Sequence, residues 1–129
     1  MLLAELKTRS EQDAFLSLAY AVALADGCLG YAERSLISMY QEEMGVDPKH
    51  HLQQAALIDA CHVFTEQYIK KIVLINLFYL AYTDGYNSSK QKSILDAIRS
   101  ELSISSAEVT RYEAEMSILK APYFPNYLD

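Results

Sequence analysis

The sequence has no tryptophan and contains only four glycines, three prolines and two cysteines among its 129 residues. Glycine and proline mark the turns between short strands. Their scarcity, together with the absence of strand-like alternation of apolar and polar residues, predicts an all-α fold. The two cysteines, Cys28 and Cys61, have no C-x-x-C spacing. This spacing argues against a disulfide framework or a zinc ribbon and favours a reducing compartment.

Long hydrophobic runs and basic segments are also missing. The longest apolar run, residues 72–82, is interrupted by Asn76 and is shorter than the roughly 20 residues that cross a bilayer. The apolar stretch at the N-terminus is too short for a signal peptide because Glu5 interrupts it. A net charge of −6 and a pI near 5.0 supply no basic face for nucleic acid. We therefore expect a cytoplasmic protein that neither spans a membrane nor binds nucleic acid.

What the sequence does contain is an internal repeat. An apolar segment followed by Asp26-Gly27 returns as an apolar segment followed by Asp84-Gly85, at an offset of 84 − 26 = 58 residues. Two copies are too few for a solenoid, so the repeat predicts a pseudo-twofold duplication inside one domain. The apolar positions on both sides of the turn keep the same register: Phe15, Leu16, Tyr20 and Val22 match Val73, Leu74, Phe78 and Leu80, and Leu36, Ile37, Tyr40 and Met44 match Ile94, Leu95, Ile98 and Leu102.

The predicted fold is a single-domain helical bundle of about six to seven helices over residues 1–129. Repeat one covers about 10–62 and repeat two about 65–120, with three helices in each. The first helix of each repeat is apolar on most sides, which places these two helices at the centre of the bundle. The tail, 121–129, carries two prolines and cannot be helical, and its aromatic residues are expected to dock on the domain.

Helix boundaries follow from capping residues. Ser10 is expected to cap a first helix that runs from about Glu11 to Ala25. Asp47-Pro48 combines a capping residue with a proline at the first helical position, and predicts a third helix that continues to about Cys61.

The aspartates of the two turns are the strongest candidates for a functional site. Asp26 and Asp84 each follow the C-terminal end of a helix, where the negative end of the helix dipole disfavours a carboxylate. One explanation is local, with the side chains accepting N–H groups of the turn. The other is a divalent cation held by Asp26 and Glu33, with Asp84 contributing if the pseudo-twofold axis brings the turns together. The sequence leaves both explanations open.

Other patterns point to binding and not to catalysis. The sequence has no glycine-rich phosphate loop, no serine nucleophile elbow and no Glu-x-x-His pair, so we expect a non-enzymatic protein. Ten tyrosines are present, and Tyr31 and Tyr86 are candidates for an exposed contact surface. The expected partner is another protein or a second copy of the chain in a homodimer.

The segment around the first turn, LADGCLGYAE (residues 24–33), resembles the tellurite-resistance TerB-like family, and YTDGYN (82–87) resembles that family's second copy. The resemblance extends over most of the chain. It implies a compact helical domain of two similar units, a non-enzymatic role in stress resistance, and a divalent metal bound by acidic residues. By position, those residues are Asp26, Glu33 and Asp84.

The second half departs from the family pattern at two positions. Gln91 stands at the position equivalent to Glu33, and Asn87 at the position equivalent to Leu29. A neutral amide is a poorer metal ligand than a carboxylate, so the metal site is expected to be one-sided, weak or lost. The alternative function is a metal-free protein–protein interaction or scaffold module.

Overall fold

The structure is a computed structural model that describes residues 2–25, 27, 29–47, 55–82, 89–112 and 114. Within these ranges the chain is helical and has no strand, so the prediction of an all-α bundle is confirmed. No helix in the described part is long and apolar enough to cross a membrane. The tail 121–129, expected to dock on the domain, lies outside the described residues. The elements are η1 (Leu3–Glu5), α1 (Arg9–Ala23), α2 (Tyr31–Met44), α3 (Leu57–His62), α4 (Gln67–Tyr82) and α5 (Ser89–Glu101), and residues 106–112 are also helical.

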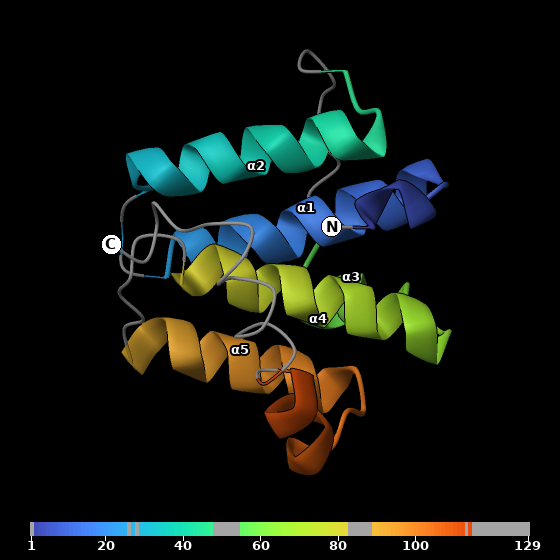
Figure 1. Ribbon diagram of the computed structural model, residues 1–129, viewed down its shortest axis with the longest axis vertical. Helices are drawn as coiled ribbons and strands as arrows, with labels where there is room; N and C mark the ends of the chain where they lie inside the picture. The colour runs from blue at the N-terminus through green and yellow to red at the C-terminus, as the bar shows by residue number, and fades with distance from the viewer. Residues whose placement is uncertain are drawn as a thin grey trace.

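Helices α1 and α4 lie side by side at the centre of the bundle, with α2 above them and α5 below them in Figure 1. Helix α1 packs against α2, α3, α4 and α5. Both central helices are buried along most of their length, including Phe15 and Leu18 of α1 and Leu74 and Leu77 of α4. Because burial of apolar side chains is the main force in folding, this pair forms the core on which the other helices pack.

Helix α1 begins earlier than the sequence predicted. Its N-cap is Thr8, whose Oγ1 accepts the Glu11 N–H at 3.1 Å, while the Thr8 N–H donates to Glu11 Oε1 at 3.3 Å. This reciprocal capping box satisfies two otherwise unpaired N–H groups. Ser10 is therefore inside the helix and is not its cap. The helix ends at Ala23, two residues before the expected Ala25.

The prediction of a continuous helix from Asp47-Pro48 to Cys61 is wrong. Ala56 is extended (φ −63°, ψ 151°) and α3 begins only at Leu57. The physical reason is a long-range hydrogen bond: the Ala55 N–H donates to Ser17 Oγ of α1 at 3.1 Å. The Ser17 hydroxyl in turn donates to the Asp13 carbonyl at 2.8 Å.

Helices α2 and α5 end in the same way. Each is followed by a residue with positive φ, Gly45 (74°) and Ser103 (59°), and 103 − 45 = 58. The N–H groups of this residue and of the next one bond to carbonyls of the last helical turn. These N···O distances are 3.1 and 2.8 Å after α2, and 3.0 and 3.1 Å after α5. Both ends are therefore Schellman-type caps.

We expect opposite effects from substitutions at these two caps. Gly45→Ala should destabilise the domain by about 1 kcal/mol, because an L side chain is strained at positive φ. A Cβ at Gly45 meets nothing within 4 Å, so the loss would come from the backbone alone. Ser103→Gly should stabilise the domain by about 0.5 kcal/mol, because glycine adopts a positive φ without the strain that a side chain causes. Urea unfolding measures both values, and a shift of the two variants in the same direction would contradict the argument.

Candidate functional site

Glu33 is a buried carboxylate in the first turn of α2, with only 6% of its surface exposed. Its Oε1 accepts the Gly30 N–H at 3.1 Å, so the side chain reaches back to the start of its own helix. A carboxylate at this position also faces the positive end of the helix dipole. Both interactions compensate for part of the cost of removing the charge from water.

The second oxygen of Glu33 contacts the other half of the chain. Gln91 Nε2 donates to Glu33 Oε2 at 3.1 Å and also lies 3.4 Å from the Val22 carbonyl oxygen. Gln91 is 3% exposed and lies in the first turn of α5, as Glu33 does in α2. The two positions are separated by 91 − 33 = 58 residues, the offset of the repeat. Two residues at matching positions of the predicted repeat therefore touch each other inside the bundle.

This contact was missed at the sequence level, although the signal was present. The repeat aligns Gln91 with Glu33, and an amide is a hydrogen-bond donor to a carboxylate as well as a poorer metal ligand. Residues related by a twofold axis can touch only if both lie beside the axis. An amide matched with a carboxylate at the repeat offset is thus a usable indication of a hydrogen-bonded pair.

Four helix ends gather at one end of the bundle. The C-termini of α1 and α4 and the N-termini of α2 and α5 all lie toward the left in Figure 1. In the sequence, Asp26-Gly27 lies between α1 and α2, and Asp84-Gly85 lies between α4 and α5. Asp26, Asp84 and Tyr86 themselves lie outside the described residues.

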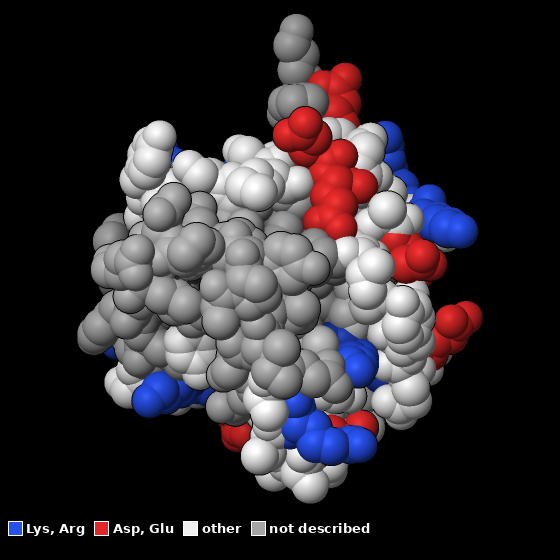
Figure 2. Space-filling model, viewed as in Figure 1, with Lys and Arg blue, Asp and Glu red and all other residues white. Residues whose placement is uncertain are grey.

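Tyr31 occupies the first position of α2, two residues before Glu33, and is 88% exposed. Its exposure fits the prediction that it belongs to a contact surface. On the face shown in Figure 2, acidic side chains form a band near the C-terminal end of α2, and basic side chains lie both to the right of this band and lower, toward α5. The described residues contain no group of three or more His, Cys, Asp or Glu side chains that could hold a metal.

Cys61 is a buried thiol near the end of α3. Burial, followed by the nearby Glu101 carboxylate, raises the pKa of Cys61 to about 11. The thiol is therefore protonated at neutral pH, whereas the thiolate is the nucleophilic form. The adjacent His62 is exposed, and its Nε2 lies 3.1 Å from Glu101 Oε2, which links α3 to α5.

Comparison with known proteins gives no match: no family model, no curated protein and no solved structure is similar to this chain. The resemblance to the TerB-like family therefore stays a prediction based on the Asp-Gly segments.

Proposed function

We propose that the chain is a non-enzymatic, stress-associated TerB-like domain that binds a divalent cation at the end of the bundle where the two Asp-Gly turns meet it. Asp26 and Glu33 are the proposed ligands, and Asp84 is the third. The single observation that carries the proposal is the hydrogen bond between Glu33 and Gln91, because it brings the starting points of α2 and α5 together.

The proposed duplication is supported by the boundaries of the helices. Adding 58 to the first residues of α1 and α2 gives 67 and 89, which are the first residues of α4 and α5. The shared caps at Gly45 and Ser103 extend the correspondence beyond the helices. A chain with two equivalent halves would have two equivalent turns, and the contact between Glu33 and Gln91 supports this proposal because the two residues are 58 positions apart.

The chemistry of the described residues is compatible with a cation. A carboxylate oxygen has two lone pairs, so Glu33 can accept an N–H group and still coordinate a metal. Amide carbonyl oxygens such as that of Gln91 are ligands that Ca²⁺ accepts, although they add no negative charge. Two aspartates would supply the remaining charge. Such a site would contain fewer carboxylates than an EF-hand, so its affinity for the cation should be lower.

Thermal unfolding with added calcium, magnesium, manganese or zinc tests this proposal. An ion present at 100 times its Kd should stabilise the domain by about 2.7 kcal/mol, which corresponds to roughly 10 °C in Tm for a chain of this size. Asp26→Asn should lose most of that shift. Glu42→Gln should keep it, because Glu42 is an exposed acid near the opposite end of α2.

Two results would refute the cation site: no shift with any of the four ions, or an equal shift in Asp26→Asn and in the unmodified chain. The second result would indicate binding elsewhere on the acidic surface. In either case the assignment as a helical binding module would have to be supported by other means.

The second candidate is a metal-free interaction or scaffold module, which associates with another protein or with itself. It is favoured by the exposure of Tyr31 beside a carboxylate that already accepts two hydrogen bonds within the chain. If the chain forms homodimers through this surface, Tyr31→Ser should weaken them in sedimentation experiments. Tyr68→Ser, at a half-exposed tyrosine of α4, is the matched control. A strictly monomeric chain would exclude self-association.

A further inference from the structure

A pocket of about 440 Å³ lies between α4, α5 and the helical segment 106–112. Pockets of roughly 300–1,000 Å³ are typical of small-molecule sites. Glu33, the one proposed cation ligand that the structure describes, is not among the described residues that line the pocket. The Glu33 carboxylate therefore does not account for this pocket.

One part of the lining is apolar and partly aromatic. Phe78 and Tyr82 of α4 stack one helical turn apart, with ring centroids 6.4 Å apart and an angle of 14° between the planes. Leu95 of α5 and Val109 of the 106–112 segment complete this part. Together they offer a flat apolar surface to the body of a ligand.

The other part of the lining carries positive charge. Lys92 and Arg99 of α5 both contribute to the pocket, together with one acid, Asp96. The Asp96 side chain is 73% exposed, whereas that of Arg99 is only 22% exposed. Among the described lining residues, cations outnumber acids, although the chain as a whole has a net charge of −6.

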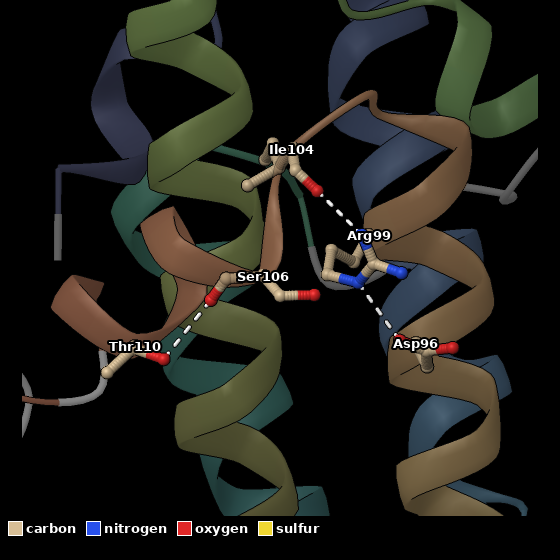
Figure 3. A network of polar contacts seen from close by, with 5 residues as sticks. All are labelled: Asp96, Arg99, Ile104, Ser106 and Thr110. Carbon is tan, nitrogen blue, oxygen red and sulfur yellow. Dashed lines mark hydrogen bonds and ion pairs between the residues drawn. The ribbon is translucent and has the colours of Figure 1, made fainter.

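The guanidinium group of Arg99 is held in place from two sides. Its Nε donates to Asp96 Oδ1 at 2.9 Å, and its Nη1 donates to the Ile104 carbonyl at 2.7 Å (Figure 3). The second bond reaches across the end of α5 to the backbone that leads into 106–112. A guanidinium group has five N–H donors, so an arginine fixed in this way keeps donors for a further acceptor.

Hydroxyl groups lie on the wall opposite α5. Thr110 Oγ1 donates to the Ser106 carbonyl at 3.1 Å, and the Ser106 side chain projects toward Arg99 in Figure 3. Both residues line the pocket. Among the described lining residues, the wall facing the arginine is thus polar and neutral and contributes no acid.

We propose that this pocket binds a small amphipathic carboxylate, a molecule with an aromatic or short acyl body and one carboxylate. The body would lie on Phe78, Tyr82 and Val109. The carboxylate would lie at Arg99, whose planar group matches a carboxylate in shape and charge, with Lys92 as a second cation. The pairing of an apolar surface with a held guanidinium group selects this class over neutral apolar molecules and over polyanions.

The test is titration of the full chain with phenylbutyrate, followed by calorimetry or by NMR shifts, with phenylbutanamide as the neutral analogue. Phenylbutyrate should bind, and the amide should bind about tenfold more weakly because it lacks the charge that Arg99 recognises. Arg99→Gln should reduce the affinity for phenylbutyrate by about tenfold or more. Lys92→Gln, at an exposed position, should reduce it less and is the variant to use if Arg99→Gln does not fold.

The matched control is Arg34→Gln. Arg34 is exposed in α2 and is separated from Lys92 by 92 − 34 = 58 residues. The substitution therefore removes the same charge at the position that matches Lys92 in the repeat. The affinity of Arg34→Gln for phenylbutyrate should equal that of the unmodified chain. Equal affinity for acid and amide would overturn the proposal, as would unchanged binding in both Arg99→Gln and Lys92→Gln. Absence of phenylbutyrate binding to the full chain would also overturn the proposal. This holds too if the reason is that a segment of the chain itself, such as 121–129, occupies the pocket.

Discussion

Gln91→Glu should destabilise the domain by about 3 kcal/mol at neutral pH. It places a second carboxylate against Glu33, where the present donor–acceptor distance is 3.1 Å. Two carboxylates cannot both stay ionised at this separation in a buried site, so one must take up a proton or the charges must separate. Chemical denaturation at neutral pH measures the loss, and lowering the pH should reduce it because protonation removes one of the two charges.

The exchanged pair Glu33→Gln with Gln91→Glu is the control for this prediction. It restores one carboxylate and one amide, and glutamine can replace glutamate in a capping box. The double variant should recover most of the stability that Gln91→Glu alone loses. A double-variant loss equal to the sum of the two single losses would show that the two side chains are not coupled.

The single variant Gln91→Glu also tests the cation proposal. In Gln91→Glu a divalent ion would bridge two carboxylates and so relieve their repulsion, and it would bind more tightly than in the unmodified chain. If stability returned with acid but not with any ion, the pair would be a structural link between the halves. The proposed cation site would then lose the observation that carries it.

The arrangement of the core could be predicted from the sequence because it follows from local patterns. Helical periodicity, the two all-round apolar segments and the 58-residue register identified the central pair and the apolar faces of α2 and α5. Among the repeat positions, Phe15 and Leu74 are buried as expected. Such patterns depend on residues three or four positions apart, which the sequence displays directly.

The features that were missed depend on contacts between distant residues. The break before α3 is fixed by a bond from Ala55 to Ser17, 38 residues away. The repeat offset aligns Glu33 with Gln91, but their contact also requires α2 and α5 to begin side by side. Tertiary hydrogen bonds of this kind override local helix signals, and helical periodicity alone does not report them.

The N-terminal segment is the other feature that periodicity could not find, because η1 has only three residues. Its Leu3 side chain is fully buried, and the Leu3 N–H donates to Glu43 Oε2 of α2 at 2.8 Å. Leu6 is buried as well, and its carbonyl accepts a hydrogen bond from Gln12 Nε2 at 2.9 Å. The segment therefore packs as part of the core and contacts both α1 and α2.

Leu3→Ala should accordingly destabilise the domain by about 3 kcal/mol, as expected for a fully buried leucine that leaves a cavity. Leu2→Ala is the matched control, because Leu2 is the preceding residue of the same type and is 56% exposed. Its effect should stay within about 0.5 kcal/mol. Urea unfolding of both variants decides the matter. Equal and small losses would mean that η1 is not part of the core, whereas a large difference between adjacent leucines can arise only if the first turn of the chain is held in a fixed position against α2.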